Sequence, residues 1–220
     1  MEIKLIVADD HSLFRKGLIA LLRDYTGIKI IGEAESGRQL IDIINAEKES
    51  IDIILLDLAM NDLSGYEILK KLRKDKSPIK TLVISMYDDN VSIRKAFEEG
   101  ANGYLYKGAD TEDIFKAIKS ITEKGFYFNE KANLALFNKT TPEGKPRILN
   151  TKASIKFSDR EIKIIQMFGD GLSNSEVGEK LFISHRTVET IRQHMIKKVG
   201  VRNVIGLVLF AVKNRLIDIS

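Results

Sequence analysis

The chain has 220 residues, of which 44% are hydrophobic and 30% are charged, and it contains no cysteine. This composition is typical of a globular protein and excludes disulfide bonds, thiolate metal sites and a cysteine nucleophile. The chain has neither an apolar run long enough to cross a membrane nor a signal-peptide pattern at its start. We therefore expect a cytoplasmic protein with no membrane partner.

Basic and acidic side chains are unevenly distributed along the chain. Residues 1–137 hold 20 Lys and Arg against 23 Asp and Glu, a net charge of −3. Residues 138–220 hold 15 against 8, a net charge of +7, and the two values give the +4 of the whole chain. An acidic first part and a basic second part predict two domains with different partners.

The two parts meet in a segment that has the composition of a linker. Residues 138–154 contain two of the three prolines and show no periodic apolar pattern. We expect a first domain over residues 1–128 and a second domain over residues 155–220. Residues 129–154 join them, and the segment NEKANLALF at their start can form a short helix.

The first part alternates between strand and helix patterns. Short apolar runs that predict strands lie at residues 3–9, 29–34, 51–57, 81–87 and 102–107. Each run is followed by apolar residues at helical spacing, at residues 12–24, 37–48, 65–74, 91–99 and 111–122. Five such units predict an α/β doubly wound fold of the flavodoxin-like kind, with a parallel five-stranded sheet between helices. No G-x-G-x-x-G motif follows the first strand, so a dinucleotide site is not expected.

Polar residues stand where four of the predicted strands end. The first strand ends in Asp9 and Asp10, the third in Asp57, the fourth in Ser85 and the fifth in Lys107. For any one of these residues alone, a loop cap is the better explanation. Because the ends of parallel strands meet at one edge of a sheet, the five together predict a site.

The residue types at this edge suit the chemistry of phosphate. Carboxylate oxygens are the ligands that Mg²⁺ prefers, and a metal beside Asp57 would favour a phosphoryl group on that carboxylate. The Lys107 ammonium and the Ser85 hydroxyl could then contact the phosphoryl oxygens.

Residues 1–125 resemble the receiver domain of a two-component response regulator. The matching segments are VADDHSLFRKGL, LLDLAMNDLSGYE, the Ser85-Met86 pair and GANGYLYK. The resemblance implies that a sensor histidine kinase phosphorylates Asp57, and that Asp9, Asp10, Asp57 and the Ala59 backbone carbonyl bind Mg²⁺. It also implies that Lys107 anchors the phosphoryl group, that Ser85 moves toward it, and that Tyr104 follows as an aromatic switch.

Two positions depart from the common receiver pattern. Asn61 stands where a proline is usual, and Gly108 follows Lys107 where proline is frequent. Because proline would pre-set the backbone, Asn61 predicts a looser loop after Asp57. Neither change removes a functional group.

The second part has the pattern of a helix-turn-helix module. Ser158 with Glu161, and Ser173 with Glu176, have capping-box spacing, and Ser184 is the expected N-cap of a longer helix. A short helix, a tight turn and a longer helix rich in basic and polar residues predict DNA binding. A plain helical bundle with a solvated basic face is the alternative. The turn and the net charge of +7 favour DNA.

Residues 155–215 resemble the LuxR-type helix-turn-helix domain of the NarL/FixJ response regulators. The segments that carry this resemblance are SDRE, GLSNSEVGEKLFIS, RTVE and KKVGVRN. It implies a recognition helix over residues 185–199 and a dimerisation helix over residues 203–213. Glu189 and Ile191 depart from the pattern, since lysine and histidine are common at those positions, so the resemblance does not carry a DNA sequence preference over to this chain.

The DNA contacts divide into two groups by their chemistry. Glu189, Thr190 and Gln193 lie within about one helical turn and can read base edges. Lys197, Lys198 and Arg202 are better placed to hold phosphates. The residues expected to contact DNA are Arg186, Thr187, Glu189, Thr190, Gln193, His194, Lys197, Lys198 and Arg202.

We therefore predict a transcriptional response regulator, not an enzyme, that binds double-stranded DNA and forms a homodimer on phosphorylation or on DNA. One alternative is a DNA-binding regulator whose receiver is controlled by protein contacts independently of phosphate. Another is a phosphohydrolase with an aspartyl nucleophile. That chemistry needs a second acid two residues after Asp57, where the chain has Ala59.

Overall fold

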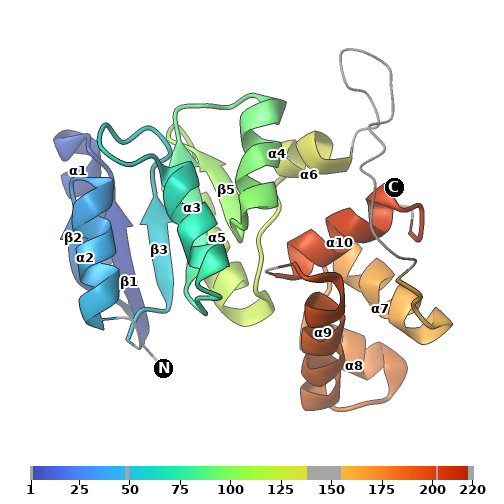
Figure 1. The fold of residues 1–220 in the computed structure, drawn as a ribbon. Helices are drawn as coiled ribbons and strands as arrows, with labels where there is room; N and C mark the ends of the chain where they lie inside the picture. Colours follow the sequence, from blue (N-terminus) through green and yellow to red (C-terminus); the bar gives the residue numbers. More distant parts are fainter. Residues whose placement is uncertain (1, 48–49, 138–154, 202, 218–220) are drawn as a thin grey trace. The chain divides into compact units, whose positions relative to one another are not determined.

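The structure is a computed structural model that describes residues 2–47, 50–137, 155–201 and 203–217 (Figure 1). The chain divides into two compact units, Met1–Asn129 and Glu130–Ser220. Among the described residues, no helix is long and apolar enough to cross a membrane.

The first unit is built on a five-stranded parallel sheet. Its strands are β1 (Ile3–Ala8), β2 (Ile28–Ala34), β3 (Ile53–Leu56), β4 (Lys80–Ser85) and β5 (Gly103–Tyr106). The spatial order is β2-β1-β3-β4-β5, so the direction of winding reverses between β1 and β3. This confirms the predicted doubly wound sheet. Ligands of such folds bind outside the carboxyl ends of the strands at the point of reversal.

Helices cover both faces of the sheet. They are α1 (Ser12–Arg23), α2 (Gly37–Glu47), α3 (Gly65–Lys74), α4 (Asn90–Glu99) and α5 (Thr111–Lys124). Apolar residues of α1 and α5 share one buried cluster with alternate residues of the strands, such as Leu5, Leu55 and Leu82. The intervening residues face the other way, toward the layer of α2, α3 and α4 that Figure 1 shows in front of the sheet.

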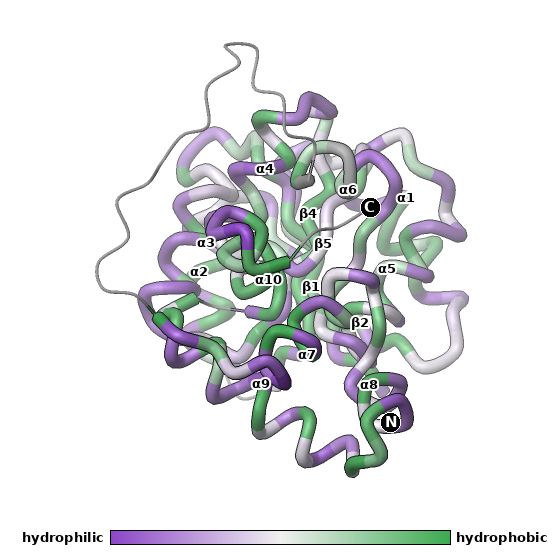
Figure 2. Tube along the Cα trace, turned by 90° about the vertical axis from the view of Figure 1, so that its right-hand side faces the viewer, coloured by the Kyte–Doolittle hydropathy of each residue, from purple (hydrophilic) through white to green (hydrophobic). Residues whose placement is uncertain are grey.

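The hydropathy colouring agrees with this layered arrangement, because the strands at the centre of the unit are mainly hydrophobic (Figure 2). The predicted elements all appear, and their ends differ by a few residues. The fourth strand, for example, ends at Ser85 and not at Tyr87, because the Tyr87 N–H turns to the Ser85 Oγ, 3.3 Å away.

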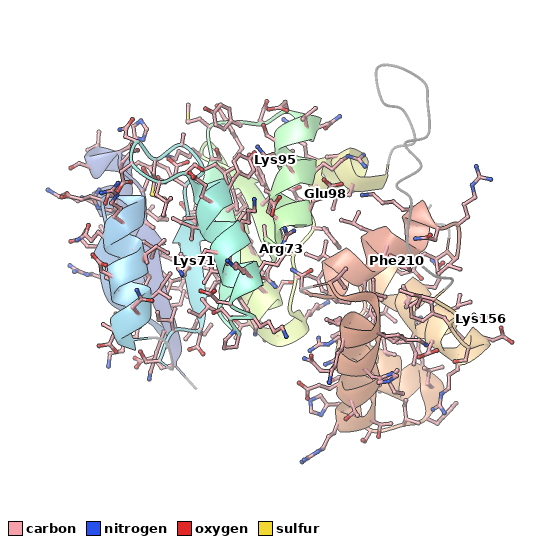
Figure 3. All side chains as sticks on the ribbon, viewed as in Figure 1. Lys71, Arg73, Lys95, Glu98, Lys156 and Phe210 are labelled. Carbon is pink, nitrogen blue, oxygen red and sulfur yellow. The ribbon has the colours of Figure 1, made fainter. Side chains whose placement is uncertain are left out.

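Polar contacts join neighbouring helices on the α3–α4 face. Arg73 on α3 donates to the Glu98 backbone carbonyl on α4 at 2.8 Å, and its Nη2 lies 2.9 Å from the Glu99 carboxylate (Figure 3). The Lys95 ammonium lies 4.1 Å from the centre of the Tyr66 ring. These contacts hold α3 and α4 side by side on the same face of the sheet.

The start of α3 lies directly against the end of β3. The Gly65 N–H donates to the Leu58 carbonyl at 3.1 Å. A Cβ atom at position 65 would lie only 2.3 Å from the Asp57 carbonyl oxygen. Glycine is therefore required here for the close approach of the two backbones. A capping box between Ser64 and Glu67 completes the first turn of α3.

The second unit is helical in its described residues. Its helices are α6 (Glu130–Phe137), α7 (Asp159–Gly169), α8 (Asn174–Leu181), α9 (His185–Val199) and α10 (Val204–Lys213). Ile165 and Phe168 of α7, Val188 and Met195 of α9, and most of α10 are buried. In Figure 2, α9 is largely hydrophilic, whereas α10 is largely hydrophobic.

Hydrogen bonds at the helix starts agree with the sequence pattern of this unit. Ser158 and Ser173 both form capping boxes, and Ser184 Oγ accepts from the Thr187 N–H at 3.1 Å. The last helix begins at Val204 because Asn203 caps it, accepting from the Gly206 N–H at 2.9 Å. A helical C-terminal region of helix-turn-helix type is therefore confirmed.

Candidate functional site

Three acidic residues and one lysine meet at the carboxyl edge of the sheet. Asp9 and Asp57 are 3% and 2% exposed, and the Asp10 side chain is 14% exposed. The Lys107 ammonium, at the end of β5, lies 2.7 Å from Asp57 Oδ2 and 2.7 Å from Asp9 Oδ2. The folded chain thus brings together four of the residues that the sequence placed at strand ends.

Burial and pairing act against each other on the charges of this site. Burial raises the pKa of Asp9, and the hydrogen bonds from Lys107 and from the His11 N–H offset this only in part. Burial acts to lower the pKa of Lys107, but its hydrogen bonds to Asp57 and Asp9 reverse the direction and raise it. The lysine is therefore held in its charged form by the two carboxylates that it contacts.

The same edge has the donor atoms that a divalent cation needs. Four possible ligand atoms lie within 4.8 Å of one another, one each from Asp9, Asp10, His11 and Asp57. Within the described part of the chain, Asp10 Oδ1 is buried and has no hydrogen-bond partner. A set of carboxylate oxygens with one uncommitted acceptor fits Mg²⁺, a hard cation that prefers oxygen.

Ala59, whose carbonyl is an expected metal ligand, lies next to this cluster. Its backbone N–H donates to Asp57 Oδ1 at 3.2 Å. This hydrogen bond holds the loop after β3 close to the Asp57 carboxylate.

Ser85 and Tyr104 occupy the neighbouring strands β4 and β5 and are almost completely buried. The Tyr104 hydroxyl donates to the Tyr87 carbonyl at 2.5 Å. Burial raises the pKa of Tyr104, against the effect of a side-chain hydrogen bond with Ser85. The two proposed switch residues are therefore linked to each other and to the loop after β4.

Two contributors to this site were missed by the sequence analysis. Arg15 is 5% exposed, and its Nη1 donates to the Asp9 backbone carbonyl at 2.6 Å. Its position on the apolar stripe of α1, three and four residues before Leu18 and Ile19, was the available signal. His11 points its Nδ1 toward Asp10 Oδ1 at 3.0 Å, and its position directly after Asp10 is the only signal for it.

The loop after Asp57 is tied to its surroundings, whereas the replacement of proline by Asn61 predicts a looser loop. The Asn61 amide donates to Asp10 Oδ2 at 2.8 Å. The next residue, Asp62, accepts backbone N–H groups of Gly37, Arg38 and Leu63 at 2.8, 3.0 and 2.7 Å. These hydrogen bonds connect the loop to Asp10 and to the start of α2, and the looser loop expected from Asn61 stays a prediction.

The predicted recognition helix α9 presents most of its expected DNA contacts to solvent. Exposed residues among them are Arg186, Thr187, Thr190, Gln193, His194, Lys197 and Lys198. Glu189 is half-buried, with its carboxylate 3.9 Å from Arg192 Nη2. Arg202 lies outside the described residues. Ile191 is half-buried and, with Thr190 and His194, lines a shallow hollow beside the start of α7.

Lys198, near the end of α9, is engaged within the second unit. Its ammonium lies 3.3 Å from Glu161 Oε2 on α7, and 4.7 Å from the centre of the Phe157 ring. In turn, Phe157 makes an edge contact with Phe210 of α10. Lys198 therefore joins α9 to α7.

Two family models match the chain, and together they cover both units. Residues 5–119 match the model described as the response regulator receiver domain. Residues 156–211 match the model of bacterial regulatory proteins of the luxR family.

Several curated proteins are similar to the chain over nearly its whole length. Transcriptional regulatory protein DegU of Brevibacillus brevis is 29% identical, over 97% of this chain and 94% of that protein. Oxygen regulatory protein NreC of Staphylococcus aureus is also 29% identical, over 98% and 99% of the respective chains.

Solved structures show the same likeness. The response regulator ChrA, of a heme-sensing two-component system, is 30% identical over 98% of this chain and 99% of its own, with a TM-score of 0.51. The response regulator RcsB in complex with DNA has a TM-score of 0.56 over 96% and 99% of the two chains, at 19% identity. The second comparison shows similarity of fold alone.

Proposed function

Because the chain belongs to the NarL/FixJ family of response regulators, which join a receiver domain to a LuxR-type DNA-binding domain, we propose that a sensor histidine kinase phosphorylates Asp57 and thereby controls DNA binding. The observation that carries this proposal is the buried Asp57 carboxylate, 2.7 Å from the Lys107 ammonium, among further carboxylates at the edge of the sheet. As a member of this family, the chain is a DNA-binding transcription factor and not an enzyme.

In this proposal, the residues that would hold Mg²⁺ are Asp9, Asp10, Asp57 and, through its backbone carbonyl, Ala59. Bound there, the ion would offset the like charges of the carboxylates and favour a phosphoryl group on Asp57. Asp57 supplies the nucleophilic oxygen, and its hydrogen bonds from Lys107 and from the Ala59 N–H orient the carboxylate. Arg15 fixes the Asp9 backbone from behind the site.

Lys107, Ser85 and Tyr104 carry the signal in this proposal. Lys107 already donates to the Asp57 carboxylate. After phosphorylation its ammonium would contact the phosphoryl oxygens on Asp57 and so anchor the phosphoryl group. The Ser85 hydroxyl moves toward the phosphoryl oxygens, and Tyr104 follows. Since Tyr104 and Ser85 both contact Tyr87, their movement changes the loop after β4. A switch of this kind depends on contacts that differ between the two forms.

The output of the proposed switch is dimeric binding to DNA. Residues 1–128 form the receiver and residues 155–220 the DNA-binding domain, joined by residues 129–154. On α9, Arg186, Thr187, Thr190, Gln193 and His194 are the exposed residues that would meet DNA first. Helix α10 would mediate dimerisation on DNA, and the protein would act in the cytoplasm.

The proposal is tested by labelling the full chain with a radioactive phosphodonor in the presence of Mg²⁺. Wild-type protein should acquire acid-labile label, Asp57→Asn should acquire none, and the exposed control Asp42→Asn should label like wild type. Label on Asp57→Asn equal to that on wild type would mean that another residue is the acceptor.

The signalling step needs a second measurement. Beryllofluoride with Mg²⁺ should increase dimer formation and DNA affinity of the wild type, but leave Asp57→Asn unchanged. Regulated DNA binding without any response to beryllofluoride would favour a receiver controlled by protein contacts alone.

A further inference from the structure

Asn61 reaches across the site to one of the predicted metal ligands. Its Nδ2 lies 2.8 Å from Asp10 Oδ2, and the two residues are 51 positions apart in the sequence. A carboxylate can only accept, so the amide NH₂ group must be the donor. This hydrogen bond joins the loop after β3 to the end of β1.

The two oxygens of Asp10 are thereby placed in different situations. Oδ2 accepts from Asn61, whereas Oδ1 is buried and, in the described part of the chain, has no hydrogen-bond partner. His11 Nδ1 lies 3.0 Å from Oδ1, within the cluster of four ligand atoms. Asn61 thus occupies one oxygen and leaves the buried one available.

The loop that carries Asn61 is itself held in place. Asp62 accepts the backbone N–H groups of Gly37 and Arg38 at the start of α2. Desolvation acts to raise the pKa of Asp62, but the backbone hydrogen bonds from Arg38, Gly37 and Leu63 lower it to about 2. Asp62 therefore ties this loop to the start of α2, directly next to Asn61.

We propose that Asn61 is a positioning residue, which orients the Asp10 carboxylate for a divalent cation and so strengthens metal binding. The inference rests on the proposed function of this pocket as a metal site. Without the amide, the Asp10 carboxylate is free to rotate. The entropy lost when the metal orders it would then weaken metal binding. Hydrogen-bond partners of metal ligands commonly contribute about 10-fold or more to affinity.

The test measures Mn²⁺ binding to the full chain by electron paramagnetic resonance, with Mg²⁺ as competitor. Mn²⁺ suits this probe because it accepts the same oxygen ligands. Asn61→Ala should weaken binding by about 10-fold. The matched control is Asn90→Ala, which removes another exposed asparagine at the start of α4 and should bind like wild type.

A double-mutant cycle separates positioning from a general effect on the loop. In an Asp10→Ala background, Asn61→Ala should have almost no further effect on Mn²⁺ affinity, since the oxygen that accepts its hydrogen bond is absent. Wild-type affinity in Asn61→Ala would overturn the inference, and so would a full effect of Asn61→Ala in the Asp10→Ala background. If wild-type protein binds no Mn²⁺ at all, the metal site of the proposed function fails together with the inference.

Discussion

Lys107 donates a 2.7 Å hydrogen bond to Asp57 Oδ2, although the two residues are 50 positions apart in the sequence. The same ammonium contacts Asp9, so Lys107→Met would leave two buried carboxylates without their cation. We expect the free energy of unfolding to fall by about 3 kcal/mol in the absence of divalent ions. Saturating Mg²⁺ should restore part of this loss.

Urea denaturation followed by tyrosine fluorescence measures this effect. All six tyrosines lie between residues 25 and 127, so the signal reports unfolding of the first unit. The control is Lys116→Met, which removes a lysine that pairs with Glu112 on the surface of α5. That variant should change the stability by less than about 0.5 kcal/mol. Equal effects of the two variants would show that Lys107 does not balance buried charge.

Glu161 makes the stability of the second unit dependent on pH. Desolvation acts to raise its pKa, but hydrogen bonds from the Ser158 N–H and from Lys198 lower it below its ordinary 4.5. A lowered carboxyl pKa contributes stability that is complete above pH 4.5 and is lost as the pH falls through the lowered value.

Glu161→Gln keeps a side chain that can complete the capping box but removes its charge. It should therefore cost about 0.5 kcal/mol at neutral pH, through the lost ion pair with Lys198 and the lost interaction with the helix N-terminus. The difference from wild type should shrink as the solution is acidified below pH 4.5. Amide hydrogen exchange in α7 measures it locally. A difference that stays constant down to the lowest pH would mean that the charge of Glu161 has no part in the cap.

Gln193 lies on the exposed side of α9, where a glutamine can bond adenine through two hydrogen bonds. Gln193→Ala should relax the preference at one defined base pair, at a cost of about 1–3 kcal/mol for the preferred sequence. Selection on randomised DNA measures the preference. An unchanged selected sequence with uniformly lower affinity would assign Gln193 to the phosphates.

Lys197 and Lys198 are adjacent and of one type, but they differ in their partners. Because Lys198 already contacts Glu161, less of its charge is available to phosphate. Lys197→Ala should reduce the slope of log affinity against log salt by about 0.9, as expected for one lost phosphate contact. Lys198→Ala should reduce it less. Equal slopes for the two variants would contradict the role of Lys198 as a link to α7.

The strands and the site edge could be predicted because they depend on local pattern. Apolar runs ending in Asp10, Asp57 and Lys107 indicate buried strands with polar tips, and parallel pairing then brings the tips together. The capping boxes of Ser158 and Ser173 were equally visible, since both partners lie three residues apart.

Two of the contacts that the sequence did not predict join side chains that are far apart in the sequence. Asn61 with Asp10, and Lys198 with Glu161, are separated by 51 and 37 positions. Periodicity shows which face of an element is buried, but it does not show which polar group stands opposite. Arg15 is an intermediate case, because its place on the apolar stripe of α1 was visible and its partner was not.

The absence of a side chain at Gly65 also has a mechanical consequence. The backbone of the first turn of α3 packs directly against the Asp57 carbonyl. No side chain lies between them that could absorb a movement by changing its rotamer. Its Ser64–Glu67 cap makes the same turn stiff. If the Asp57 main chain moves by a fraction of an ångström, one of two changes must therefore follow. Either the first turn of α3 unwinds, or the whole helix shifts as a rigid body.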